Sequence, residues 1–257
     1  MDIIIISITA FCAALLTFFS GFGLGTILTP VFVLFFPIEE AIALTAIVHF
    51  FNNIFKLFLV GKNADRQVLI RFGIPAVIAA LFGSWLLIHL SGLEPLYTYS
   101  LWNNLYIVYP VKFIIAIILI IFAFMDLIPY FGKIQFGKEK LPIGGLLSGF
   151  FGGLSGNQGA LRSAFLIKAG LTKDTFIGTT VVVSTFVDMT RLSVYATKIL
   201  NSNILDNRHI ILAATLAGIA GSYLGNFLLK KVTLQFLQWS VAVLLIAISI
   251  AMGLGWI

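Results

Sequence analysis

Residues 114–124 read IIAIILIIFAF, an unbroken apolar run that decides the fold class. A strand of a membrane-spanning β-barrel alternates apolar and polar residues over about 10 positions, whereas a spanning helix needs about 20 mostly apolar residues. Outward from this run, the apolar stretch extends over residues 107–128, which is long enough for one such helix. We therefore predict an all-α integral membrane protein, because hydrocarbon leaves the backbone polar groups of open structures unpaired.

The composition of the whole chain agrees with this class. The 257 residues are 60% hydrophobic and only 10% charged, whereas charged residues make up about 25% of a typical water-soluble domain. A net charge of +6 in such a chain is expected in the loops on the cytoplasmic side, so it indicates no nucleic-acid partner. Membrane lipid is the expected surrounding. Because Cys12 is the single cysteine and the histidines are dispersed, we expect no metal and no cofactor.

Eight stretches of the chain are apolar and long enough to span a membrane. The connections between them are too short to form a further domain, so we expect a single multi-pass membrane domain over residues 1–257, in the inner or plasma membrane. The predicted spans cover residues 3–36, 38–60, 68–90, 107–128, 142–168, 172–200, 209–229 and 234–257.

An internal repeat relates the two halves of the chain. A shift of 135 residues aligns polar residues that lie within apolar helices, including Thr45 with Thr180 and Asn53 with Asp188. We therefore predict a duplication, with repeat one at about 1–128 and repeat two at about 142–257. Four spans in each repeat make the halves parallel, related by an axis along the membrane normal.

Eight spans also place both termini on one side of the membrane. On this threading the same side carries eight of the basic residues, so the positive-inside rule gives a weak preference for cytoplasmic termini. These basic residues are Lys62, Arg66, Arg71, Lys133, Lys138, Lys140, Lys198 and Arg208.

Each repeat opens with a segment too rich in glycine for a plain helix. The first segment is SGFGLGT at residues 20–26, and the second is GFFGGLSGNQGALR at residues 149–162. Glycine lets the chain leave the helical conformation, and irregular backbone in a membrane survives only where it is buried or lines a watery cavity. A half-helix that begins after such a break directs free N–H groups and its positive dipole end at the cavity, which favours an anion.

Polar side chains in the helices add to this prediction. Arg162 lies within an apolar helix and therefore requires a partner or a watery site. Asp188 and Arg191 lie on one helix face, where they form either a structural ion pair or part of the site. Lys56 is expected to reach the membrane surface, and His49 to be a hydrogen-bonded packing residue.

The opening GFGLGTILTP, the block GGLLSGFFGGLSGNQGALRSAFLIKAGL, and the later DTFIGTT and DMTRLSVY resemble the TauE/SafE family of membrane anion permeases over nearly the whole chain. The resemblance implies about eight helices in two repeats that carry sulfur-containing anions such as sulfite, sulfoacetate or related organosulfonates, as secondary transport. It also places segment 152–162 and the region around Asp188 and Arg191 at the transport site.

We therefore expect a secondary transporter of small anions, not an enzyme, with Asp188 as the candidate residue for proton coupling. A passive anion channel, or an intramembrane enzyme or assembly factor that uses the same glycine-rich site, remains an alternative. The sequence does not determine the anion, the direction, the coupling ion or the oligomeric state. The predicted substrate-binding residues are Gly21, Gly23, Gly25, Thr45, Asn53, Gly153, Gly156, Asn157, Gln158, Gly159, Arg162, Thr180 and Arg191.

Overall fold

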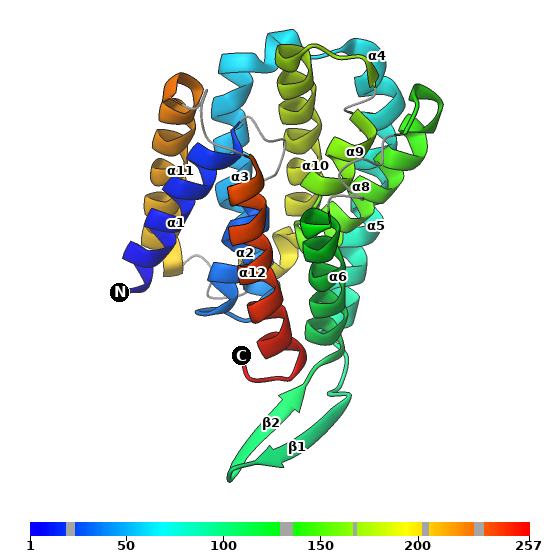
Figure 1. Ribbon diagram of the computed structural model, residues 1–257. Helices are drawn as coiled ribbons and strands as arrows, with labels where there is room; N and C mark the ends of the chain where they lie inside the picture. Colours follow the sequence, from blue (N-terminus) through cyan, green and yellow to red (C-terminus); the bar gives the residue numbers. More distant parts are fainter. Residues whose placement is uncertain (19–23, 129–135, 167–168, 202–205, 229–233) are drawn as a thin grey trace.

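The computed structural model describes residues 1–18, 24–128, 136–166, 169–201, 206–228 and 234–257, and most of them are helical (Figure 1). In the first half, the helices are α1 (Asp2–Thr17), α2 (Leu24–Val33), α3 (Ile38–Val60), η1 (Gly61–Asn63), α4 (Arg66–Val68), η2 (Leu69–Gly73), α5 (Ile74–Ser91) and α6 (Pro110–Leu127). In the second half, they are η3 (Lys138–Lys140), α8 (Leu141–Ser155), α9 (Gly159–Leu166), α10 (Lys173–Asn201), α11 (Arg208–Leu228) and α12 (Leu234–Gly253).

These helices follow the apolar stretches of the sequence closely. Within the described residues, three helical segments are long and apolar enough to cross a membrane, namely Ile38–Asn63, Arg66–Ser91 and Arg208–Phe227. Four further apolar helices are shorter, namely Asp2–Thr17, Leu24–Val33, Pro110–Met125 and Ala242–Gly253. The chain is thus a helical membrane protein, although its helices do not divide into eight simple spans.

The structure adds a β-hairpin that the sequence analysis treated as a plain connection. Strand β1 (Tyr97–Leu101) pairs antiparallel with β2 (Asn104–Val108), and Tyr97 lies opposite Val108. The two-residue turn between them holds Trp102 and Asn103 at φ 49° and 62°, the left-handed conformation that tight hairpin turns require. The hairpin extends beyond the end of the helix bundle (Figure 1), where the hydroxyl of Tyr99 donates to the carbonyl of Leu254 near the C-terminus at 2.7 Å.

Helices α3 and α10, which the predicted repeat makes equivalent, run in opposite directions, so the predicted parallel arrangement does not hold for these helices. At the end of α3, the backbone around Val60 lies against Gly178 near the start of α10, and the amide of Asp65 donates to Thr179 at 2.9 Å. The same reversal relates the last helix of each half, because Gly253 at the end of α12 meets Ala116 near the start of α6. Helix α3 is therefore antiparallel to α10, and α6 is antiparallel to α12.

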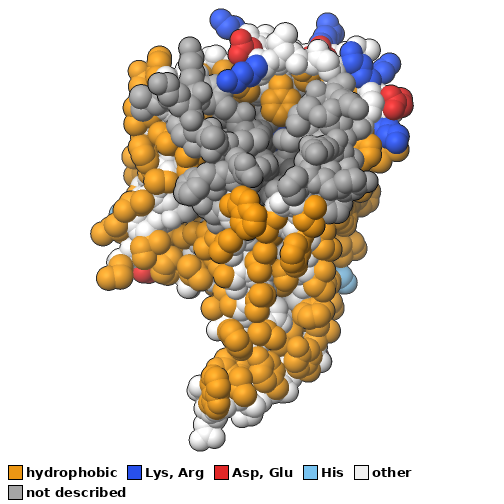
Figure 2. All heavy atoms as spheres, viewed as in Figure 1, with side chains coloured by type: hydrophobic (Ala, Val, Ile, Leu, Met, Phe, Trp, Pro, Cys, Tyr) orange, Lys and Arg blue, Asp and Glu red, His pale blue; other side chains and the backbone are white. Residues whose placement is uncertain are grey.

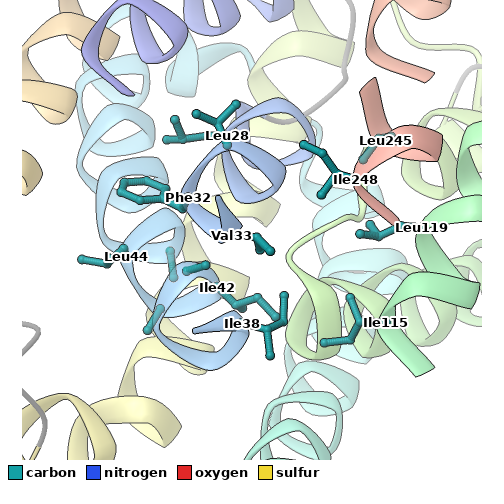
Figure 3. Close-up of a cluster of buried hydrophobic side chains, with 14 of the residues drawn as sticks. Leu28, Phe32, Val33, Ile38, Ile42, Leu44, Ile115, Leu119, Leu245 and Ile248 are labelled. Carbon is teal, nitrogen blue, oxygen red and sulfur yellow. The ribbon is translucent and has the colours of Figure 1, made fainter. Parts of the chain in front are cut away.

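The physical reason for this error lies in the glycine-rich segments. Each was counted as one pass, but each is a helix followed by a short helix that turns back. Gln158 lies against Gly152, whereas Phe165 lies against Gly144, so α9 returns along α8. In the first half, α1 rises in Figure 1, α2 descends from Leu28 to Phe32 in Figure 3, and α3 rises again. With this extra pass each half has an odd number of passes, which is the count that an inverted repeat requires.

Glycines set the closest helix contacts, as the small-xxx-small spacing predicts. Helix α8 packs on α5 through Gly149 and Gly153 and on η2 through Gly145, and a Cβ at Gly149 would lie 1.9 Å from the carbonyl oxygen of Ala76. The two halves use equivalent contacts. Gly83 of α5 lies against the backbone of Phe150, and Gly221 of α11 lies against the backbone of Phe11.

An apolar core joins the two halves. Figure 3 shows Leu28 and Phe32 of α2 beside the α3 side chains, with Ile115 of α6 and Ile248 of α12 closing the cluster. These side chains are buried in the core. The broken helix α2 is therefore held in place by apolar packing from both halves.

Basic residues gather at the end of the bundle opposite the termini and the hairpin (Figure 2). That end carries six described basic residues, on or beside η1, α4, η2, η3 and the start of α10, whereas the helix ends on the side of the termini carry Lys112, Lys198 and Arg208. The weak preference for cytoplasmic termini thus loses its basis, since it depended on counting the two glycine-rich segments as single passes. The six are Lys62, Arg66, Arg71, Lys138, Lys140 and Lys173.

Candidate functional site

The second glycine-rich segment breaks the helix as predicted. Helix α8 ends at Ser155, and Gly156 follows with φ +75°, a left-handed conformation that glycine adopts without strain. The amide of Gly156 donates to the carbonyl of Gly152 at 3.0 Å, and α9 starts at Gly159. The predicted residues Gly156, Asn157, Gln158 and Gly159 therefore lie at a true helix break.

The two breaks meet inside the bundle. The hydroxyl of Thr26, in the first turn of α2, donates to Oδ1 of Asn157 at 3.1 Å. Beside it, a Cβ at Gly25 would lie 3.1 Å from the carbonyl oxygen of Gly156, so glycine permits this close approach. Two other predicted residues of the first break, Gly21 and Gly23, lie outside the described residues.

A buried polar cluster lies where α3 crosses α10. Nδ1 of His49 is 2.6 Å from Oδ2 of Asp188, and Nδ2 of Asn53 donates to the same oxygen at 2.9 Å. On the other side of the carboxylate, Nε of Arg191 donates to Oδ1 at 3.0 Å. Because an ionised carboxylate only accepts, the imidazole is the donor to Asp188. Asp188 is therefore compensated from both helices.

A small cavity lies beside this cluster, between the end of α1 and helices α3, α9 and α10. Its volume of about 20 Å³ is room for about one water molecule. Lys56 and Arg162 both line it, and Arg162 also donates to the hydroxyl of Ser184. The full lining consists of Thr17, Phe18, His49, Asn53, Lys56, Arg162, Ile177, Thr180, Val181 and Ser184.

Two buried cations face this cavity. Lys56 is 5% exposed and Arg162 1% exposed, so both cations are withdrawn from bulk water. Among the buried residues that the structure describes, Asp188 is the only carboxylate, and Arg191 already compensates it. Buried cations require a counter-charge or a watery site. The cavity is therefore suited to a small anion.

The structure places the predicted site residues in three different regions of the bundle. Asn53, Arg162 and Thr180 line the cavity. The carbonyl of Gly153 accepts from Tyr195 and Ser84, and its Cα packs on α5, so close helix contact already explains this glycine. The remaining described residues lie near the helix breaks or beside Asp188, and they do not line the cavity. They are Gly25, Thr45, Gly156, Asn157, Gln158, Gly159 and Arg191.

Two important lining residues were undervalued from the sequence. Lys56 does not reach the membrane surface but is buried, with its ammonium 5.4 Å from the centre of the Phe18 ring. His49 is hydrogen-bonded as expected, yet it also faces the cavity. The spacing of His49, Asn53 and Lys56, at i, i+4 and i+7, places all three on one helix face. That spacing was the signal that could have identified both.

Helices broken inside an apolar bundle and a buried polar cavity are features of a helical membrane transport protein. The family model of the sulfite exporter TauE/SafE matches residues 6–252. The chain therefore belongs to the TauE/SafE sulfite exporter family, as the sequence resemblance predicted. This is a family of transporters and not of enzymes, which removes the intramembrane enzyme as an alternative. Searches of curated proteins and of solved structures gave no match.

Proposed function

We propose that the chain is a secondary transporter of sulfur oxyanions or organosulfonates, of the sulfite or sulfoacetate type, and that it binds them between Lys56 and Arg162. The observation that carries this proposal is the pair of buried cations at one cavity, with no described carboxylate beyond the compensated Asp188. Asn53, Thr180 and Ser184 supply hydrogen-bonding groups to the anionic oxygens.

The small volume of the cavity indicates that this conformation is closed to the substrate. A space of about 20 Å³ holds about one water molecule, so an oxyanion enters only after α9 or the end of α1 moves away. Sulfite requires a smaller expansion than sulfoacetate, because it lacks the carboxymethyl group. This favours the smallest oxyanions as the best substrates.

Movement of one half against the other provides alternating access. Two supports are the inverted direction of equivalent helices and the matched contacts of Gly83 and Gly221. Inverted repeats in transporters exchange conformations across the membrane, so one half opens the site to each side in turn. We propose repeat one at about 1–128 and repeat two at about 142–257.

The protein is proposed to reside in the cell membrane with its termini and hairpin outside the cytoplasm. The support is the gathering of six basic residues at the opposite end, because basic residues are retained on the cytoplasmic side. This orientation reverses the weak preference from the sequence.

We also propose that Asp188 couples transport to protons, together with His49, its hydrogen-bonding partner. The 2.6 Å contact joins an imidazole, which can carry a proton, to a carboxylate beside the cavity. A proton that moves onto this pair changes the charge next to the anion and links the two fluxes.

Flux of radiolabelled sulfite into proteoliposomes tests the proposal, with and without an imposed pH gradient. We expect saturable uptake that accumulates sulfite when the gradient is imposed, competition by organosulfonates, and loss of uptake in Lys56→Gln, with Lys62→Gln at the exposed end as the matched control. Uptake that neither saturates nor accumulates would indicate a passive channel. Absence of flux for every sulfur anion would overturn the substrate class.

A further inference from the structure

We propose a second anion-binding subsite at the helix breaks, formed by Arg191, Thr29, Thr45 and Asn157 and separate from the cavity at Lys56. This inference rests on the proposed transport of small anions and assigns a second binding site along the transport pathway. Its ligand class is a small oxyanion, bound by a guanidinium, two hydroxyls and an amide.

The first support is a set of buried polar atoms without hydrogen-bond partners. Among the described residues, Nη1 of Arg191, Nδ2 of Asn157 and the hydroxyls of Thr29 and Thr45 have none. All four side chains are at most 3% exposed. A buried polar group without a partner costs about 1–3 kcal/mol, and more when it is charged, so four at one place indicate a missing ligand.

These four side chains come from one region of the bundle, around Gly25 and Gly156. A Cβ at Gly156 would lie 2.9 Å from Nη1 of Arg191 and 3.4 Å from the hydroxyl of Thr29. A Cβ at Gly25 would lie 3.4 Å from Cγ2 of Thr45 and 3.1 Å from the carbonyl of Gly156. Gly25 and Thr29 are four residues apart and so share one face of α2.

Asn157 adds an oriented donor. Its Oδ1 accepts from the hydroxyl of Thr26 at 3.1 Å, which fixes the amide group. Its Nδ2 then remains as a donor without a protein partner. The donors in this region are thus preorganised for the oxygens of an anion.

The inverted repeat supports the same assignment independently. The cavity pairs Lys56 of α3 with Thr180 of α10. Their repeat equivalents are Arg191 of α10 and Thr45 of α3, and the unpartnered hydroxyl of Thr180 matches that of Thr45. Because equivalent helices run in opposite directions, the repeat predicts a second cation–threonine site on the other side of Asp188.

The two sites lie at different depths in the bundle. Thr45 and Lys56 are eleven residues apart on α3, which corresponds to about 16 Å along the helix axis. His49, Asn53 and Asp188 lie between them. An anion that leaves one site therefore passes the His49–Asp188 pair before it reaches the other.

Titration calorimetry of the purified protein in lipid nanodiscs with sodium sulfite tests this subsite. We expect two binding events per protein. The double variant Thr29→Val/Thr45→Val removes two donors but preserves side-chain shape, so it should weaken one event about tenfold or more and leave the other unchanged. The matched variant Thr29→Ser/Thr45→Ser retains the hydroxyls and should behave as the wild type. Thr180→Val should weaken the other event instead.

A single binding event that Thr180→Val weakens and Thr29→Val/Thr45→Val leaves unchanged would overturn the second subsite while leaving the proposed transport intact. Absence of both sulfite binding and sulfite flux in the wild type would instead overturn the proposed function, and the subsite with it. A thermal unfolding midpoint measured on each variant separates loss of binding from loss of fold.

Discussion

Asn53 and Asp188 are equivalent positions in the two halves of the chain, and they touch each other. Nδ2 of Asn53 donates to Oδ2 of Asp188 at 2.9 Å, across 135 residues of sequence. Equivalent residues contact one another only where a twofold axis passes between them. The proposed inverted repeat accounts for this contact, because its axis would then pass close to this hydrogen bond.

Loss of Asp188 should destabilise the protein strongly. Asp188→Asn leaves the buried Arg191 without its counter-charge, which costs about 3–5 kcal/mol. The double variant Asp188→Asn/Arg191→Gln removes both charges and should recover part of this loss. Unfolding midpoints of both variants in detergent check the expectation, and a double variant as unstable as the sum of the two single changes would contradict it.

Arg162→Ala should abolish sulfite flux while the protein remains in the membrane. The change removes one of two cations at the cavity and leaves the apolar packing of α9 largely intact. Arg162→Lys retains the charge and should keep part of the flux. Normal transport by Arg162→Ala in proteoliposomes would remove this residue from the site.

Flux of His49→Gln should no longer respond to a pH gradient. Glutamine retains hydrogen-bonding capacity toward Asp188 but has no titratable group, whereas an imidazole can bind and release a proton. Sulfite uptake is measured with and without the gradient, and Asn53→Gln serves as the control at the same carboxylate. A His49→Gln variant that still accumulates sulfite under the gradient would place the coupling elsewhere.

Gly149→Ala should separate α8 from α5. The added Cβ would lie 1.9 Å from the carbonyl oxygen of Ala76, a backbone atom that has no room to yield. Overpacking of this kind costs about 1–3 kcal/mol and lowers the unfolding midpoint. Gly92→Ala is the matched control, since its nearest neighbour would lie at an ordinary 3.6 Å. Equal midpoints for the two variants would count against the close contact.

Cysteine labelling should place the hairpin outside the cell. In a Cys12→Ala background, which removes the exposed native thiol, a membrane-impermeant maleimide should label Leu105→Cys in intact cells. Lys62→Cys should react only after the cells are permeabilised. The reverse pattern would restore cytoplasmic termini.

The helical membrane class, the positions of the longer helices and the second glycine break could be predicted from the sequence. These features are local or periodic, because an apolar run of sufficient length can satisfy its backbone in lipid only as a helix. The family also followed from the sequence, through the block around residues 149–162.

Only the tertiary structure shows that α3 and α10 are antiparallel and which side chains line the cavity. Helix α2 has 10 residues and α9 has 8, too few to register as a separate pass in a hydropathy pattern, yet each reverses the chain. Lys56 and His49 belong to the cavity because α9 and α10 cover their face of α3. Which neighbour covers a helix face depends on packing between distant segments, and no single helix encodes it.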